Sequence, residues 1–294
     1  MIPKEILKKV RRIQIRTQHM VNNVFAGEYH SVFKGQGMEF QEVREYYPGD
    51  EIRSIDWNVT ARMGLPFVKK FREERELTVM LMVDISASHT FGSSRQLKKD
   101  LAAEIAAILA FSAIQNNDRV GLILFTDDIE AYLPPKKGTP HVLRVIREVL
   151  YFQPKKKRTR IVPALDFLNH VTNRKTVSFL ISDFVTIEEL KRPLAVTARR
   201  HDLVGVVVGD KRERAWPAVG LVDWIDAETG TRHVVDTSDR ETRRRLGLMQ
   251  AQRRELLSDI FAAVGVDAID VNAGEPYERE FVKFFKRRER RLRI

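Results

Sequence analysis

Short apolar runs alternate with helical patterns over most of the chain and predict its fold class. The runs VMLMV, VGLILF and VSFLI are hydrophobic at consecutive positions, as in strands buried on both faces of a sheet. Between them, apolar residues recur at helical spacing, for example in the helix expected over 96–115. Strands of this kind separated by helices predict an α/β fold with a mostly parallel, doubly wound sheet covered by helices on both faces.

Further along the chain, two patterns refine this sheet. The run IEAYLP, at 129–134, follows VGLILF too closely for a crossover helix, so we expect one antiparallel edge strand there. LVGVVV and VDAIDV are two more buried strands, and helices are expected over 187–200 and 240–264. The segments LVDWID and TRHVVDT, split by AETG, predict a β-hairpin before the last long helix.

The first third of the chain differs from the rest. Apolar positions over 6–25 fall near helical spacing and predict a helix docked on its own domain; a membrane-surface helix is the alternative, although this stretch has no Trp. The segment 35–76 is rich in turn signals and aromatic residues, which indicates strands and turns. We therefore expect an N-terminal helix with a β-rich extension over 1–76, the α/β domain over 77–275, and a basic helix or tail over 276–294.

Composition narrows the class of protein. The 294 residues are 43% hydrophobic, enough for a packed core, and contain no cysteine, which excludes disulfides, thiolate metal sites and cysteine nucleophiles. No apolar run is long enough to cross a bilayer, and the first twenty residues lack the apolar core of a secretory signal. These features predict a soluble, cytoplasmic protein.

The formal net charge is +11, and its distribution matters more than its size. The last twelve residues, KFFKRRERRLRI, hold seven Lys/Arg and one Glu, a net charge of +6. Such a segment is a generic contact for nucleic acid, anionic lipid or an acidic protein face, and it is equally typical of a solvated helix end.

Side-chain oxygens gather where strands end. Asp84, Ser86 and Ser88 come directly after the first buried strand, Asp183 follows another, and Thr159 stands in a loop before a helix. Because ligands bind outside the carboxyl ends of parallel strands, we expect these side chains to converge there. Carboxylate and hydroxyl oxygens suit Mg²⁺ or Mn²⁺. Each residue taken alone also fits a helix N-cap or a loop anchor, so the alternative stays open.

Three segments carry a resemblance to a known family: EFQEVREYYPGDEIRSIDWNVTAR, FVKKFREERE and VDISAS. They resemble the bacterial domain-of-unknown-function-58 family and, more widely, the von Willebrand factor A fold with its metal-ion-dependent adhesion site (MIDAS). That site combines D-x-S-x-S with a later Thr and Asp. The resemblance implies that the hydroxyls bind metal directly, that the carboxylates act through water, and that one position stays open for a partner's carboxylate. It assigns these roles to Asp84, Ser86, Ser88, Thr159 and Asp183.

This sequence departs from the family pattern at two places. His89 stands where Met is usual, and Thr159 follows four cations instead of glycines. These cations are Lys155, Lys156, Lys157 and Arg158. Positive charge disfavours a metal but favours an acidic partner, so we expect weak metal affinity in isolation that rises with the partner present. The four cations and His89 are the expected partner-binding residues.

The upstream motif supplies a second set of charged and aromatic residues. Its members are Arg44, Asp50, Arg53, Asp56, Trp57, Arg62 and Glu74. We interpret them as a buried ion-pair lattice that fixes the extension, because bidentate Arg–carboxylate pairs stabilise segments poor in helix. A binding surface is the alternative.

The sequence offers no catalytic machinery, so we expect a protein that is not an enzyme. It has no nucleophile elbow, Walker A loop, G-x-G-x-x-G or His-rich zinc motif. The resemblance implies an adaptor or co-chaperone for a MoxR-type AAA+ ATPase. Two alternatives remain: a nucleic-acid or anionic-surface binder acting through 283–293 and 155–160, whose binding would weaken with salt, and a divergent metal-dependent hydrolase.

Overall fold

A computed structural model describes residues 4–21, 29, 32–33, 37–74, 76–93 and 96–292. The chain divides into two compact units. One is the extension, Phe33–Leu77, and the other joins Met1–Val32 to Thr78–Ile294. We call the second the main unit. The domain limits expected from the sequence, at 76 and 275, stay a prediction.

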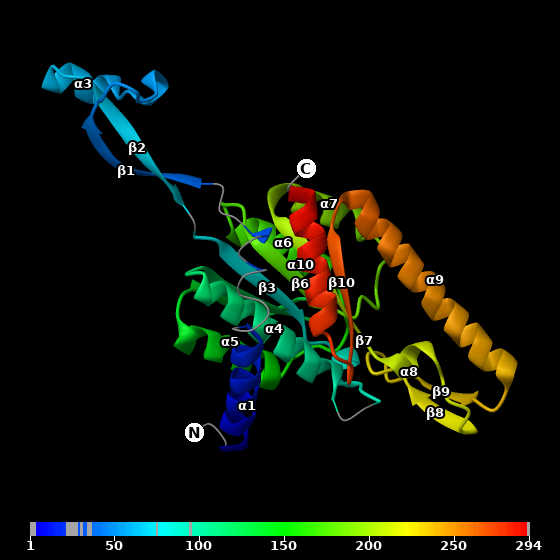
Figure 1. Ribbon diagram of the computed structural model, residues 1–294. Helices are drawn as coiled ribbons and strands as arrows, with labels where there is room; N and C mark the ends of the chain where they lie inside the picture. The colour runs from blue at the N-terminus through cyan, green and yellow to red at the C-terminus, as the bar shows by residue number, and fades with distance from the viewer. Residues whose placement is uncertain are drawn as a thin grey trace. The chain divides into compact units, whose positions relative to one another are not determined.

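A six-stranded sheet forms the centre of the main unit, with the strand order β10-β7-β6-β3-β4-β5 (Figure 1). All neighbouring pairs are parallel except β4–β5, which is antiparallel. The strands are β3 (Thr78–Asp84), β4 (Arg119–Phe125), β5 (Ile129–Lys136), β6 (Val177–Ser182), β7 (Asp202–Gly209) and β10 (Asp267–Asn272). The predicted α/β class, with a mostly parallel sheet and one antiparallel edge strand, is confirmed.

Helices cover both faces of this sheet (Figure 1). One layer contains α1 (Lys4–Met20), α4 (Lys98–Gln115), α5 (Thr139–Tyr151) and α10 (Glu278–Leu292). The other contains α6 (Val162–Val171), α7 (Lys191–Arg200) and α9 (Arg240–Val264). Alternate β3 residues Met80 and Met82 join the apolar cluster under this second layer, as the two-residue period of a strand requires.

The first helix packs on the main unit, as the sequence predicts. Val10, Ile13 and Thr17 of α1 are buried, and α1 contacts α4 and α5. Its polar side adds the ion pair between Lys9 and Asp100 of α4. Because α1 and α5 cover the outer side of α4, that helix is buried around most of its circumference. Among the described residues, no helix combines the length and apolar character needed to span a membrane.

The extension contains more helix than the sequence indicates. Strands β1 (Gly37–Glu45) and β2 (Phe67–Glu74) pair antiparallel, and η2 (Ile52–Ser54) and α3 (Trp57–Met63) lie between them in the chain. The expectation of strands and turns alone is therefore wrong. Helix α3 has seven residues, too few for a visible apolar period, and its ends carry the local signals instead. Asp56 accepts hydrogen bonds from the backbone N–H groups of Asn58 and Val59, and Gly64 ends the helix with a φ of 74°.

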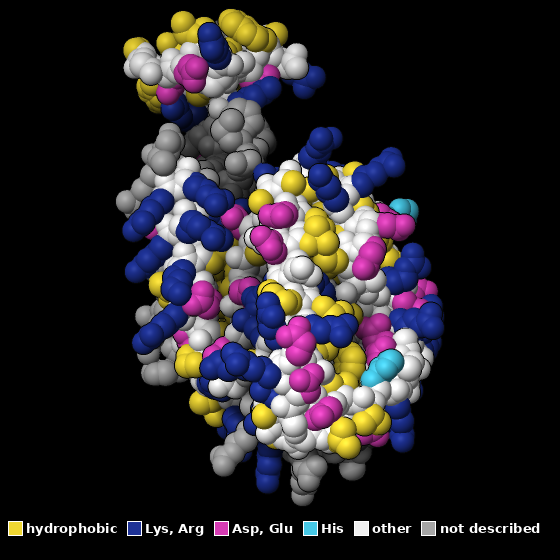
Figure 2. Space-filling view, turned by 90° about the vertical axis from the view of Figure 1, so that its right-hand side faces the viewer, with side chains coloured by type: hydrophobic (Ala, Val, Ile, Leu, Met, Phe, Trp, Pro, Cys, Tyr) yellow, Lys and Arg dark blue, Asp and Glu magenta, His cyan; other side chains and the backbone are white. Residues whose placement is uncertain are grey.

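The motif residues of the extension form pairs but no buried lattice. Arg44 donates two hydrogen bonds to Asp50, at 2.8 and 2.7 Å, and Asp56 pairs with Lys69 at 3.5 Å. Trp57 is 67% exposed, and Arg53 and Arg62 are exposed as well, which corrects the expected burial. The side chain of Glu74 lies outside the described residues. Figure 2 shows hydrophobic side chains gathered at one end of this unit; the exposed ones are Tyr47, Ile52, Trp57, Met63 and Leu65.

The predicted β-hairpin is confirmed. It consists of β8 (Leu221–Ile225) and β9 (Arg232–Asp236) and precedes α9, whose limits match the prediction. The short elements η3 (Ala87–Thr90) and α8 (Lys211–Arg214) complete the main unit and were not expected, because neither is long enough to show a period.

Candidate metal centre

The predicted oxygen residues meet where the winding of the sheet reverses. Strand β3 pairs with β4 on one side and β6 on the other, both parallel, so the chain leaves β3 and β6 at the same edge. Asp84 ends β3, and Asp183 follows β6 directly. In open α/β sheets this position is where ligands bind.

The Asp84 carboxylate is buried and held on two sides. Its Oδ1 accepts a hydrogen bond from the Ser86 N–H at 2.9 Å, and its Oδ2 accepts one from the Ser182 hydroxyl at 2.7 Å. His89 Nε2 lies 3.6 Å from the same Oδ2. Ser182 is not among the residues predicted from the sequence, although its place at the end of β6 beside Asp183 is a signal of the same kind. These bonds fix the orientation of the carboxylate.

A row of hydroxyls extends from Asp84 to the loop before α6. Ser86 Oγ lies 3.0 Å from Ser88 Oγ and 2.7 Å from Thr159 Oγ1. The loop is fixed there because the Ala87 N–H donates to the Lys157 carbonyl at 3.0 Å. Capping does not explain these hydroxyls: Ser86 precedes η3 without a side-chain cap bond, and the N-cap of α6 is Ile161.

The Asp183 carboxylate has a buried cation beside it. Lys98 Nζ, from the first turn of α4, lies 2.9 Å from Asp183 Oδ2 and 2.7 Å from Glu213 Oε1. Burial alone would raise the pKa of Asp183, but the charges of Lys98 and His89 outweigh it and lower that pKa to about 2. Burial acts against the ammonium of Lys98, yet Asp183 and Glu213 raise its pKa overall. Both groups are therefore charged at neutral pH.

In the part of the chain that the structure describes, no ammonium group pairs with Asp84. Burial and the charge of Asp183 raise the pKa of Asp84, while His89 offsets part of that effect. The two carboxylates thus lie at the same buried ends of the strands, but only Asp183 has an ammonium group beside it. A divalent cation between them would supply positive charge next to Asp84.

The residues present fit such a cation. Asp84, His89 and Asp183 each offer a ligand atom, and these atoms lie within 4.8 Å of one another. Both ring nitrogens of His89 and the Oδ1 atom of Asp183 are buried, and no hydrogen-bond partner for them is found among the described residues. Such atoms are rare in folded proteins and indicate a ligand or water. A cavity of about 70 Å³ adjoins Asp183, with Lys98 and Arg253 in its lining, and Asp84 and His89 do not line it.

The turn after β6 is held in an unusual backbone conformation. Phe184 has a φ of 50°, in the left-handed region that non-glycine residues seldom adopt. Its ring is buried and packs edge-on against Phe261 of α9, with ring centres 5.3 Å apart. From the same helix, Arg253 donates hydrogen bonds to the carbonyls of Asp183, at 3.2 Å, and Phe184, at 2.5 Å. Helix α9 therefore holds the backbone of the turn that carries Asp183.

The residues expected to contact a partner occupy two different environments. Lys155, Lys156, Lys157 and Arg158 are exposed in the loop that carries Thr159. Lys156 Nζ lies 3.6 Å from Asp127 and 3.4 Å from Asp128, so part of the loop's positive charge is compensated. His89 is 1% exposed and faces Asp84. Burial removes His89 from direct contact with a partner and places it in the metal cluster instead.

A further carboxylate reaches the hydroxyl row from the β8–β9 hairpin. Glu228 Oε1 lies 2.7 Å from Thr159 Oγ1, and Glu228 Oε2 accepts a hydrogen bond from the Thr159 N–H at 3.2 Å. Burial raises the pKa of Glu228, the bonds from Thr159 lower it, and the charges of Asp183 and Asp84 raise it again. No local pattern in the turn AETG signals this contact.

The basic C-terminal segment forms α10, and acidic residues of the sheet neutralise part of it. Arg288 pairs with Asp202, and Arg291 pairs with Asp267 at 2.9 Å. Binding of nucleic acid through this segment stays a prediction, with fewer unpaired cations than the sequence indicates.

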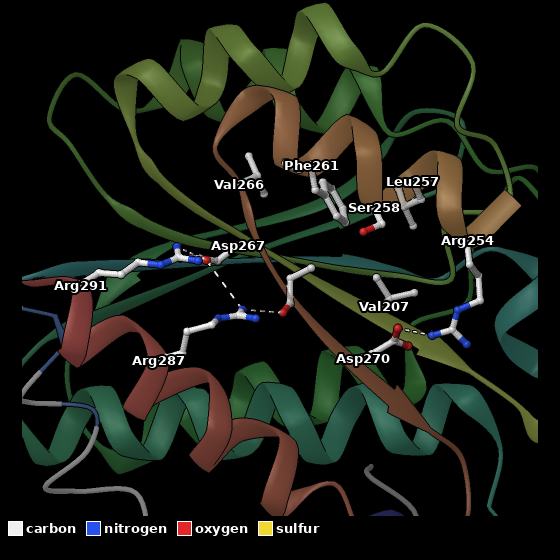
Figure 3. Close-up of a pocket in the computed structure, with 12 residues that line it drawn as sticks. Val207, Arg254, Leu257, Ser258, Phe261, Val266, Asp267, Asp270, Arg287 and Arg291 are labelled. Carbon is white, nitrogen blue, oxygen red and sulfur yellow. Dashed lines mark hydrogen bonds and ion pairs between the residues drawn. The ribbon is translucent and has the colours of Figure 1, made fainter. Parts of the chain in front are cut away.

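The cavity drawn in Figure 3 lies away from this centre, between α9 and α10 over β10. It measures about 250 Å³, with apolar residues of α9 on one side. Arg254 of α9 pairs with Asp270, and Arg287 and Arg291 of α10 pair with Asp267. These carboxylates and guanidinium groups compensate one another, so the cavity holds closed ion pairs rather than a convergent reactive group.

Comparison with known proteins identifies the family. The model of the family described as "Protein of unknown function DUF58" matches residues 42–256. The chain belongs to the DUF58 family. This DUF58 protein is 32% identical over 223 residues to "Uncharacterized protein Rv1480" of Mycobacterium tuberculosis, covering 75% of this chain and 70% of that one. It is 24% identical over 107 residues to "Uncharacterized protein YeaD" of Bacillus subtilis, covering 36% of this chain and 25% of that one.

Solved structures provide more distant likenesses to this DUF58 protein. The conserved hypothetical protein BatB from Bacteroides thetaiotaomicron is 15% identical, with a TM-score of 0.49 over 73% of this chain and 99% of that one. The von Willebrand factor type A protein from Catenulispora acidiphila is 9% identical, with a TM-score of 0.39 over 76% of this chain and 43% of that one. The fold therefore rests on the strand order and connections described above.

Proposed function

We propose that this DUF58 protein is a metal-dependent protein-binding module of the von Willebrand factor A type. In this proposal Asp84, Ser86, Ser88, Thr159 and Asp183 form a MIDAS-like site for Mg²⁺ or Mn²⁺, with His89 against Asp84. The observation that carries it is the buried cluster with unpartnered atoms on His89 and Asp183 at the carboxyl edge of the sheet. A bound divalent cation supplies positive charge that an incoming carboxylate recognises.

The chemistry of the site supports recognition of an acidic partner. Two carboxylates balance the charge of one divalent ion, but Lys98 already compensates Asp183, so the ion and the ammonium together leave the site with net positive charge. The exposed cations at 155–158 lie beside the site and favour a negative surface. As the family resemblance implies, we propose a MoxR-type AAA+ ATPase as the partner and an adaptor or co-chaperone role. In this proposal the protein acts by binding and is not an enzyme.

Thermal melts test the metal site. We expect Mn²⁺ or Mg²⁺ to raise the melting temperature relative to EDTA, because a ligand of the native state stabilises it by about 2.7 kcal/mol at 100 times its Kd. Asp84→Asn should abolish the response. Asp118→Asn is the matched control, since it alters a buried carboxylate at the start of β4, at the opposite edge of the sheet. Equal responses in the wild type and Asp84→Asn would contradict the site.

Capture of the ATPase tests the partner. The purified DUF58 protein, immobilised, should retain a MoxR-type ATPase from the same genome in Mn²⁺ and release it in EDTA. Asp84→Asn should fail to retain it, while Asp118→Asn should behave as the wild type. Retention that survives both chelation and Asp84→Asn would exclude a metal bridge.

A further inference from the structure

A carboxylate of the chain itself lies beside the proposed metal site. Glu228 contacts Thr159 through both its oxygens, with Oε1 at 2.7 Å from the hydroxyl and Oε2 at 3.2 Å from the backbone N–H. Thr159 Oγ1 is also 2.7 Å from Ser86 Oγ. Because a hydroxyl has one proton, Thr159 donates to only one of these two neighbours. The Thr159 hydroxyl therefore lies between the Glu228 carboxylate and the Ser86 hydroxyl.

The charges around Glu228 make this position unfavourable without a cation. Asp84 and Asp183 lie close enough for their charges to act on Glu228. The buried ammonium of Lys98 already contacts Asp183 and Glu213. The negative charges of Asp84 and Asp183 act unfavourably on a partly buried Glu228 carboxylate, because the local dielectric is low. A divalent ion at the same point would reverse the sign of that interaction.

The hairpin that carries Glu228 has little apolar anchoring. Leu221 and Val234, on its two strands, are 74% and 71% exposed. A two-stranded ribbon is marginally stable without packing on other elements. A segment with few buried apolar contacts also detaches at a low free energy. The contact of Glu228 with Thr159 can therefore break, and another carboxylate can replace Glu228, while the six-stranded sheet stays folded.

We propose that Glu228 is an internal ligand of the metal site, and that it occupies the position a partner's carboxylate would take. The β8–β9 hairpin then covers the site in the free protein and competes with the partner. This inference rests on the proposed metal centre and adds to it a residue of the chain's own that limits access. It predicts that loss of Glu228 weakens metal binding and opens the site to external carboxylates.

Titration with Mn²⁺ followed by water-proton relaxation tests this inference. Wild type, Glu228→Gln and Asp84→Asn are compared, with Asp223→Asn as the matched control. Asp223 is an exposed acidic residue of β8, 3.9 Å from Arg232 of the same hairpin. Glu228→Gln should bind Mn²⁺ about tenfold more weakly than wild type, the scale on which neighbouring groups tune metal affinity. The bound ion should carry more exchangeable water, seen as higher relaxivity.

Acetate is the probe for the open position. It should lower the relaxivity of the Mn²⁺ complex of Glu228→Gln at a concentration several-fold below that needed for wild type or Asp223→Asn, because it no longer competes with an internal carboxylate. Hydrogen exchange across 221–236 should slow on Mn²⁺ addition in wild type and stay unchanged in Glu228→Gln.

The outcomes separate this inference from the metal site itself. Mn²⁺ binding that Asp84→Asn abolishes and Glu228→Gln leaves unchanged in affinity and relaxivity would overturn the role of Glu228 alone. Absence of Mn²⁺ binding in both wild type and Glu228→Gln would overturn both proposals, because the site would then bind no metal with or without the internal carboxylate.

Discussion

Lys98 is the residue that most changes the character of the site. It stands next to Lys99 in the first turn of α4, where a sequence pattern indicates solvated lysines, yet its side chain is 1% exposed. Its ammonium lies between Asp183 and Glu213, so the site contains a built-in positive charge. In the absence of metal, this lysine stabilises Asp183 and Glu213 close together. Its positive charge also reduces the affinity of Asp183 for a metal ion.

Replacement of Lys98 should therefore change stability and metal affinity in opposite directions. Lys98→Met leaves Asp183 buried without its ammonium, which we expect to lower the free energy of unfolding by about 3 kcal/mol in EDTA. The same change should tighten Mn²⁺ binding, because the ion no longer competes with a fixed cation. Urea denaturation with and without Mn²⁺ measures both quantities.

Lys99→Met is the control for this prediction, since it removes an adjacent lysine that is less buried than Lys98. Lys99→Met should leave the free energy of unfolding and the Mn²⁺ affinity close to those of wild type. Equal Mn²⁺ affinity in Lys98→Met and wild type would refute the competition.

His201 provides a pH-dependent contribution far from the metal site. Its ring is 2% exposed, and its Nδ1 accepts a hydrogen bond from the Thr176 N–H at 3.3 Å, so that nitrogen has no room for a proton. Burial, with a smaller effect of Arg200, lowers the pKa of His201 to about 4. The unfolded chain, in which a histidine titrates near 6.5, then binds more protons than the native state between these two values.

The contribution of His201 to the free energy of unfolding should therefore be fully present above pH 6.5 and should be lost as the pH falls towards 4. Between pH 7 and pH 5 we expect a loss of about 2 kcal/mol from this residue. Urea denaturation at the two pH values measures it. His201→Gln should flatten the difference, while His170→Gln, at an exposed position of α6, should preserve it. An equal pH dependence in His201→Gln and wild type would contradict this account.

At the scale of elements, α9 links the sheet to the metal edge. Phe261 of this helix packs on Phe184, beside Asp183, and its ring also lies over Gly205 of β7. A Cβ atom at Gly205 would approach the ring to 2.7 Å, closer than carbon atoms pack. The glycine in β7 thus permits the helix to lie near enough for Arg253 to reach the turn after β6.

Two glycine replacements separate this packing from a general effect of glycine. Gly205→Ala should lower the free energy of unfolding by about 1–3 kcal/mol, because it overpacks the contact with Phe261. Gly247→Ala, in α9, meets only the Arg214 carbonyl at 3.5 Å and should raise stability by about 0.5–1 kcal/mol. Thermal or chemical denaturation of both variants measures the difference. A stabilising Gly205→Ala would show that the helix has room to move outward.

At the scale of the whole molecule, the sequence predicts what depends on periodicity and strand ends. The sheet, the antiparallel edge strand, the hairpin and the convergence of Asp84 with Asp183 follow from buried strands whose carboxyl ends share one edge. Lys98 and Glu228 could not be predicted this way. Glu228 stands in the turn between β8 and β9 and not at the carboxyl end of a strand of the central sheet, so neither periodicity nor turn chemistry specifies its contact with Thr159. The exposure of Trp57 could not be predicted either, because a turn-rich segment has no hydrophobic periodicity from which the burial of an aromatic residue could be inferred.

Glu104 of α4 contacts two segments that lie far from it in the chain. Arg16 of α1 pairs with it at 3.3 Å across 88 residues, and the Tyr277 hydroxyl, just before α10, donates to it at 3.1 Å across 173 residues. Contacts between β3, α4 and β4 span short loops and form early, whereas these two require distant segments to find one side chain. On the ribosome, α4 therefore emerges long before Tyr277 can reach it. We expect the strands that build the metal edge to fold first, and the last helix to close over α4 as a late step of folding.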